Sequence, residues 1–327
     1  MKKALLFLIS LSAGIGIFIW IGRFVGWQEI RNAFSVFSGW QGLIILGLTL
    51  LAAAAGTKKW EEILRGEGTN LSFWELLKPY LAGFAIMFFA PIFFLAGEMI
   101  RAYFLKEKMS VSWSKGVFSV LIDRISEWTV NLIVIFLGGF FFLYRIGRPP
   151  IHLAIIFGAA FLFFFSLIFY FYFKIIKRES IVGFFLKLFG LERFNSGNSV
   201  LKFEREIFDF FRLENITMWK TFFFSFLKAL IMYFRAWFLI LFLGKNLSCL
   251  FALPILSFTY LAAMIPIPAV LGSHEAIQVF AFGSLGLGAP AATAFTMIIR
   301  AADILVALIG TAALFQLGIG ILKKYLR

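Results

Sequence analysis

Two apolar stretches far apart in the chain are interrupted in the same way. Pro91 stands seven residues before Glu98, and Pro268 stands seven residues before Glu275, with a glycine inside each interval. Proline and glycine both end regular helix. Inside a membrane, backbone freed from a helix persists only where protein or a water-filled cavity satisfies it. The helix breaks predicted from this pattern are Pro91, Gly97, Pro266, Pro268 and Gly272.

The composition is that of a membrane protein. Of 327 residues, 61% are hydrophobic and 15% are charged, whereas a soluble domain carries about 25% charged residues. The net charge of +14 would suggest a nucleic-acid partner in a soluble protein, but no nucleic-acid-binding motif is present. Because the basic residues lie between apolar segments, we expect them to contact anionic lipid headgroups. Cys249 is the only cysteine, which excludes an intrachain disulfide.

We predict an all-α polytopic integral membrane protein with a single membrane domain over residues 1–327. About six full spans are expected, near residues 4–25, 40–57, 116–143, 151–173, 219–243 and 291–321. The broken segments, about 76–105 and 247–287, are interpreted as re-entrant hairpins in an inverted arrangement, as in many secondary transporters. Two proline-kinked full spans would satisfy the same pattern, and both arrangements stay open.

The distribution of Lys and Arg orients these segments. Basic residues are concentrated at residues 2–3, 58–115, 174–220 and 323–327, and the loop at about 174–220 contains interfacial helices or a connector helix packed on the bundle. Cytoplasmic loops carry an excess of Lys and Arg. We therefore expect a multi-pass protein of the cytoplasmic (inner) membrane with both termini in the cytoplasm.

Ionisable side chains interrupt several apolar segments. Such groups are costly in a membrane, so they face the interior, pair with one another and mark pathways. Guanidinium groups bind phosphate through two hydrogen bonds at once, which makes four arginines the candidate lipid-headgroup or phosphate ligands: Arg101, Arg124, Arg235 and Arg300. The groups expected to orient them or to carry protons are Glu98, Asp123, Glu127, His274, Glu275 and Asp303.

Two further interpretations of these charges stay open. A closed polar core of paired charges would serve structure alone, with Glu98–Arg101 and Arg300–Asp303 as pairs three residues apart on one helix face. Lys228 is interpreted as a lysine whose stem lies in the bilayer while its ammonium reaches the interface.

No His/Cys cluster with metal-ligand spacing and no nucleotide-binding loop is present in the sequence, so we expect neither a metal nor a cofactor.

Four motifs resemble the membrane region of the lysylphosphatidylglycerol synthases. The segment Gly97-Glu98-Met99-Ile100-Arg101 resembles that family's Gly-Glu-x-x-Arg motif, and Asp123-Arg124 followed by Glu127 resembles its Glu-Arg-x-x-Asp segment with the acid types exchanged. The stretch from Pro266 to Glu275 resembles its Pro-x-x-Gly-Gly-x-Gly-x-x-Glu element without the glycine pair. Arg300 and Asp303 resemble its closing arginine segment. The motifs occur in the family's order over nearly the whole chain.

The resemblance implies a flippase-like protein and does not imply lysyl transfer, since the family's separate soluble domain makes the aminoacylated lipid and we find no such domain in the sequence. We expect translocation of an anionic or phosphate-bearing lipid, with or without proton coupling, through a polar cavity between the two breaks. An intramembrane lipid-modifying transferase or hydrolase is the first alternative, and a non-catalytic membrane scaffold is the second. Small-residue runs such as 52–56 would allow close helix packing within one chain or in a homo-oligomer.

Overall fold

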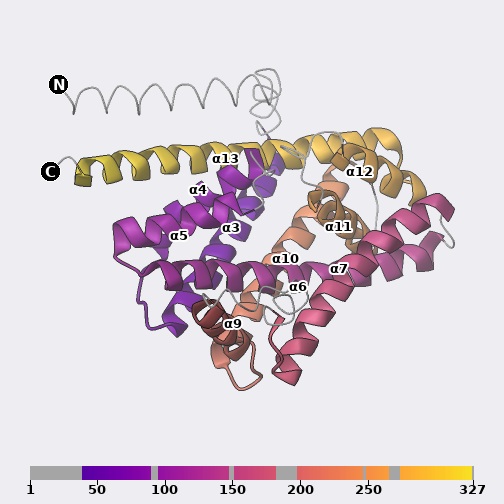
Figure 1. The fold of residues 1–327 in the computed structure, drawn as a ribbon. Helices are drawn as coiled ribbons and strands as arrows, with labels where there is room; N and C mark the ends of the chain where they lie inside the picture. Colours follow the sequence, from indigo (N-terminus) through magenta and orange to yellow (C-terminus); the bar gives the residue numbers. More distant parts are fainter. Residues whose placement is uncertain are drawn as a thin grey trace.

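The structure, a computed structural model, is helical throughout the part of the chain that it describes (Figure 1). The described residues are 39–89, 95–146, 151–181, 197–245, 248–264 and 273–325. The predicted span at 4–25 and the predicted breaks Pro91, Pro266, Pro268 and Gly272 lie outside these ranges.

The same order of helices, long, short, short and long, occurs twice along the chain. The first half contains α3 (Trp40–Gly66), α4 (Phe73–Phe89), α5 (Ala96–Met109) and α6 (Trp113–Ile146). The second half contains α10 (Ile216–Phe242), α11 (Cys249–Ala263), α12 (Ser273–Ser284) and α13 (Ala289–Tyr325). Between the halves lie α7 (Ile151–Lys177) and α9 (Gly197–Phe210).

Four of the described helices are long and apolar enough to cross a membrane. They are α3, α6, α10 and the stretch of α13 from Ala289 to Gly318, and they correspond to four of the predicted spans. One boundary was wrong: α3 does not end near residue 57 but continues to Gly66. Its last turns contain charged residues that are buried by the rest of the bundle, including Lys59 and Glu62.

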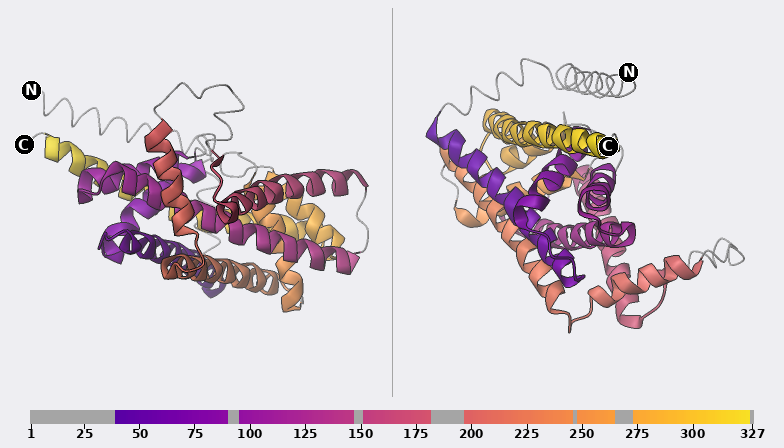
Figure 2. Two further views of the ribbon diagram at one scale, coloured as in Figure 1. Left: turned by 60° about the horizontal axis from the view of Figure 1, so that its bottom comes forward. Right: turned by 90° about the vertical axis from the view of Figure 1, so that its left-hand side faces the viewer.

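The central helices α3 and α10 run antiparallel and side by side (Figure 2, right). Near one end, Arg235 donates a hydrogen bond of 3.1 Å to Thr49. Near the other end, Gly66 lies against Thr217, so closely that a Cβ on Gly66 would be 2.6 Å from the Thr217 side chain. Since α3 and α10 are the first helices of their halves, the two halves run in opposite directions.

The two short helices of the first half also pack antiparallel. A Cβ on Gly97 would lie 2.5 Å from Met87 Cγ, whereas Arg101, one turn further along α5, lies over the ring of Tyr80, earlier on α4. Gly97, which was predicted to belong to a helix break, lies in the first turn of α5. Its missing side chain instead allows α5 to approach α4.

The corresponding helices of the second half show the same reversal. Gln278 on α12 donates a hydrogen bond of 2.9 Å to Thr259 on α11. Two residues later on α12, the Phe280 ring contacts Phe258, which precedes Thr259 on α11, at a centroid distance of 5.8 Å. In both halves, therefore, the two short helices run in opposite directions.

The halves interlock through contacts between a short helix of one and the last long helix of the other. Helix α4 packs on α13, and α11 packs on α6. Both contacts are close at a glycine. A Cβ on Gly310 would be 2.1 Å from Leu81 O, and a Cβ on Gly138 would be 2.7 Å from Leu253 O. The two halves consequently share one core.

The segment between the halves is more helical than the basic loop predicted at about 174–220. Helix α7 extends to Lys177, α9 covers Gly197–Phe210, and α10 begins at Ile216. The Phe210 ring of α9 contacts Phe118 of α6, so α9 is packed on the bundle. Of the large α7 side chains that the structure describes, most are exposed, among them Phe163, Phe165 and Phe169.

The start of α4 is held by a reciprocal cap. The Ser72 backbone N–H donates to Glu75 Oε2 at 2.8 Å, and the Glu75 N–H donates to Ser72 Oγ at 3.4 Å. We expect Ser72→Ala to lower the free energy of unfolding by about 1 kcal/mol, measured by denaturant unfolding in detergent. The Ser72 hydroxyl also donates to Glu75 Oε2, at 2.7 Å. The hydrogen bonds that the carboxylate accepts from the Ser72 backbone N–H, which has the larger effect, and from the Ser72 hydroxyl lower the pKa of Glu75 below its ordinary 4.5.

The pH dependence provides a second check on this cap. A carboxyl whose pKa falls on folding stabilises the protein above its unfolded pKa, and that stabilisation is lost as the pH falls through the folded pKa. The difference between wild type and Ser72→Ala should therefore be largest above about pH 4.5 and shrink below it. A difference independent of pH would contradict the contribution of the Glu75 carboxylate.

Candidate functional site

Seven charged side chains, six from the first half and one from α10 of the second half, form one group. We call this group the first cluster, and it consists of Lys59 (α3), Glu98 and Arg101 (α5), Asp123, Arg124 and Glu127 (α6), and Lys228 (α10).

Asp123 is at the centre of the first cluster. Only 2% of its surface is exposed. One carboxylate oxygen lies 2.8 Å from Lys59 Nζ, and the other accepts a hydrogen bond of 2.7 Å from Arg101 Nη1. Lys59 is fully buried, which an ammonium group tolerates only when it is paired. Asp123 thus compensates two buried cations at once.

The other two carboxylates of the first cluster are also paired between helices. Glu98 forms an ion pair with Arg124. Glu127 lies 2.6 Å from Lys228 Nζ and 3.2 Å from Lys59 Nζ. Lys228 is thus part of this ion-pair network and is not the lysine extending to the interface that the sequence suggested.

The Arg101 guanidinium is held between aromatic rings. Its carbon lies 4.1 Å from the ring centroid of Trp60 and 4.8 Å from that of Tyr80, positions that favour a cation–π interaction. Gly83 provides room for its methylene groups, since a Cβ there would be 2.8 Å from them. Arg101 is 4% exposed, and its Nε and Nη2 find no hydrogen-bond partner within the described residues.

The second half of the molecule contains a smaller group of charges, the second cluster. Arg235 lies 2.7 Å from Asp303, and Arg300 forms an ion pair with Glu275. His274 is buried beside this group, and its Nε2 has no hydrogen-bond partner in the described part of the chain. The second cluster consists of Arg235 (α10), His274 and Glu275 (α12), and Arg300 and Asp303 (α13).

The two clusters occupy matching positions in the two halves. Lys59 and Arg235 are each the twentieth residue of their helix, and Glu98 and Glu275 are each the third. On the last long helices, the twelfth residues are Arg124 and Arg300, and the fifteenth residues are Glu127 and Asp303.

The ion pairs match as well. Arg124 of α6 pairs with Glu98 of α5, and Arg300 of α13 likewise pairs with Glu275 of α12. Lys59 of α3 pairs with Glu127 of α6, and Arg235 of α10 likewise pairs with Asp303 of α13.

The clusters lie at different depths along the central helix pair. Arg235 contacts Thr49 on α3, and Lys59 stands ten residues further along α3. Ten residues of α-helix rise about 15 Å. Because α3 and α10 are antiparallel, the clusters lie toward opposite ends of the bundle and do not form a single polar centre.

The structure brings all ten predicted ligand and orienting residues into these clusters but pairs them differently. The pair Glu98–Arg101, expected within one helix, is not formed; the described ion pairs of these residues connect α5 with α6. Sequence reasoning missed Lys59, Trp60 and Tyr80, since the first two follow the apolar part of α3. A comparison of the two halves would have found Lys59, because its position matches Arg235.

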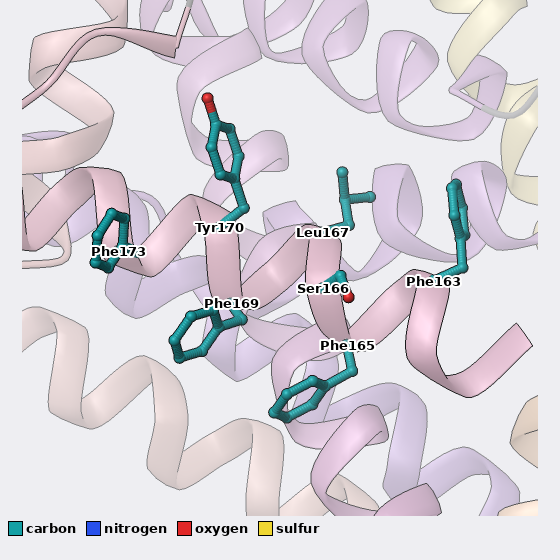
Figure 3. A pocket seen from close by; sticks show the side chains of 7 residues that line it. All are labelled: Phe163, Phe165, Ser166, Leu167, Phe169, Tyr170 and Phe173. Atoms are coloured by element: carbon teal, nitrogen blue, oxygen red, sulfur yellow. The ribbon is translucent and has the colours of Figure 1, made fainter. Parts of the chain in front are cut away.

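An apolar groove of about 610 Å³ lies elsewhere, along α7 (Figure 3). Its lining is Phe163, Phe165, Ser166, Leu167, Phe169, Tyr170 and Phe173. No member of either cluster lines it, so it is separate from the charged site. Within the described ranges, no three His, Cys, Asp or Glu side chains are placed to hold a metal ion.

A family model described as the lysylphosphatidylglycerol synthase TM region matches residues 6–310. A comparison with curated protein sequences found no match.

Proposed function

The chain belongs to the lysylphosphatidylglycerol synthase transmembrane-region family, and from this premise we propose that it moves an anionic or phosphate-bearing lipid across the cytoplasmic membrane. It is a multi-pass membrane protein. The observation that carries the proposal is the pair of matching ion-pair clusters toward opposite ends of the bundle.

Buried ion pairs are an expensive way to hold a membrane bundle together. Apolar residues of similar volume are often neutral or stabilising in place of such pairs, and intramembrane charges usually mark pathways. Their presence at the same helix positions in both halves points to a shared task. Arg101, Arg124, Arg235 and Arg300 would hold the lipid phosphate, while the carboxylates would orient the arginines.

The inverted relation of the halves supports transport. Secondary transporters are commonly built from inverted repeats, and their sites lie beside broken helices at the repeat interface. The antiparallel pairs α4/α5 and α11/α12 would then be two re-entrant hairpins that enter from opposite faces. One cluster would face each leaflet, the lipid tails would stay in the bilayer, and both termini would be cytoplasmic.

The carboxylates provide weaker support for a lipid-modifying enzyme. A general base must be available to accept a proton from its substrate, but Glu98 and Glu275 are each bound to an arginine. Rearrangement of these pairs as the headgroup passes suits a carrier, and protonation of a released carboxylate would couple such a carrier to protons. Transport measured with and without a pH gradient would establish that coupling.

A liposome assay tests the proposal. The full chain is reconstituted with fluorescently tail-labelled phosphatidylglycerol, and dithionite reports the label that reaches the outer leaflet. We expect Glu98→Gln with Arg124→Gln, and separately Glu275→Gln with Arg300→Gln, to slow transbilayer movement more than about tenfold. Neutralising both partners avoids an uncompensated buried charge.

The control neutralises an ion pair outside both clusters. Asp209 and Arg212 form an exposed pair beside the C-terminal end of α9, and Asp209→Asn with Arg212→Gln should leave the rate unchanged. Movement at the wild-type rate in both cluster variants would refute the assigned site. No movement above protein-free liposomes in the wild type would refute transport of this lipid.

A further inference from the structure

The first cluster contains three charged residues whose counterparts in the other half are uncharged. The four positions shared by the clusters hold two cations and two carboxylates in each half. The first cluster has three additional charged residues, Arg101, Asp123 and Lys228, at helix positions where the other half has Gln278, Ile299 and Ala52. With ordinary ionisation, four cations face three carboxylates in the first cluster, an excess of one positive charge. The arginines and carboxylates of the second cluster balance.

One of the additional residues keeps an open hydrogen-bonding edge. Arg101 donates through Nη1 to Asp123, but Nε and Nη2, the two donors of its other edge, are buried and find no acceptor within the described residues. Buried donors without an acceptor are costly. The planar edge that they form matches the spacing of two phosphate oxygens. Trp60 and Tyr80 fix the plane of the guanidinium.

The matching position in the second half has no free donor edge. Gln278, the sixth residue of α12 as Arg101 is the sixth of α5, is fully buried. Its amide nitrogen donates to Ile255 O at 3.2 Å and to Thr259 Oγ1 at 2.9 Å. A neutral side chain whose donors are used within the fold offers nothing to an anion.

We infer that the Arg101 edge is an anion site for one phosphodiester, the singly charged link of a phospholipid headgroup, and that the matching position of the second half, Gln278, is not such a site. The inference deepens the proposed function and rests on it. A phosphodiester carries one negative charge and neutralises the excess of the first cluster. A phosphomonoester carries about −1.5 to −2 at neutral pH and would leave a negative excess in a buried place. Tight lipid binding is therefore confined to the first cluster, whereas the arginines of both clusters would contact the phosphate as it moves across the membrane.

Calorimetric titration of the purified full chain in an uncharged detergent tests this site. The titrants are dihexanoyl phosphatidylglycerol, dihexanoyl phosphatidic acid and inorganic phosphate. We expect one phosphatidylglycerol molecule per chain, with affinity at least about tenfold higher than for phosphatidic acid or free phosphate. Arg101→Lys keeps the charge beside Asp123 but lacks the planar edge. It should fold and lose at least about tenfold in phosphatidylglycerol affinity.

The matched control is Gln278→Met at the same position of the other half, which should leave phosphatidylglycerol affinity unchanged. Wild-type affinity in Arg101→Lys would overturn the site, and so would equal affinity for phosphatidic acid. Equal affinity for inorganic phosphate would show that the site recognises free phosphate and not a lipid. A stoichiometry of two would overturn the one-sided assignment.

Transport by the same preparations separates this inference from the proposed function. If Arg101→Lys binds and transports phosphatidylglycerol like the wild type, the site is wrong and the function stands. If the wild type binds one phosphatidylglycerol through Arg101 but moves none, the function is wrong and the site stands.

Discussion

Replacing Asp123 with asparagine should lower the free energy of unfolding by about 3–5 kcal/mol. Asparagine has nearly the same shape but no charge, so Lys59 and Arg101 would remain buried without the carboxylate that compensates both. Loss of one partner of a buried pair costs far more than loss of an exposed one. Unfolding of the detergent-solubilised protein with increasing dodecyl sulfate, followed by tryptophan fluorescence, measures the change.

Two variants test whether the unpaired cations are the cause. The same substitution at exposed Asp209, which pairs with Arg212, should change stability by less than about 1 kcal/mol. Adding Lys59→Met to Asp123→Asn should recover part of the loss, because it removes one of the two uncompensated charges. If the double variant is as unstable as the sum of the single variants, Lys59 and Asp123 are not coupled.

Gly310→Ala should weaken the contact between the two halves by about 1–3 kcal/mol or more. The new methyl would lie 2.1 Å from Leu81 O and 3.0 Å from the Ala85 side chain. A backbone carbonyl cannot rotate away like a flexible side chain, so α13 and α4 must separate. The variant should therefore show a lower midpoint of thermal unfolding in detergent and slower lipid movement in liposomes.

The equivalent contact in the other half offers a neighbouring control. A methyl on Gly138 would lie 1.7 Å from Ser257 Oγ and 2.7 Å from Leu253 O, whereas a methyl on Gly139 would meet nothing within 4 Å. Gly138→Ala should destabilise like Gly310→Ala. Gly139→Ala should stabilise α6 by about 0.5–1 kcal/mol, because alanine favours helix over glycine. Equal effects at positions 138 and 139 would contradict the close packing of α6 on α11.

Much of the helical framework could be predicted from hydropathy. Four of the predicted spans correspond to α3, α6, α10 and α13, because a long apolar run in a membrane protein can satisfy its backbone only as a helix. The end of α3 was missed because hydropathy falls at Lys59. Burial of that lysine depends on Asp123, 64 residues away, and no local pattern reports a partner at that distance.

The candidate site could be predicted as a set of residues but not as an arrangement. Charges in apolar segments are rare enough to identify Glu98, Arg124, Glu275 and Arg300. Helical spacing favours partners one turn apart, which suggested Glu98–Arg101. The structure instead pairs Glu98 with Arg124, since partners from adjacent helices can approach head-on in a dry interior. Division into two clusters follows from the antiparallel packing of α3 and α10.

Helix α7 accounts for the opposite directions of the two halves. Helix α6 starts where Lys115 reaches the end of α3 and finishes near Ile45 and Ile240, at the far end of the bundle. The second half begins at the end of the bundle where α6 starts, beside Phe211. The chain therefore has to return along the bundle before α10 can form. Helix α7 makes this return. The second half consequently begins at the opposite end of the bundle from the first half.

A return pass needs length and apolar character more than a particular packing surface, which fits the exposed aromatic residues of α7. A chain without α7 would place its second half in the same direction as its first, and the charges of both halves would then lie toward the same end of the bundle.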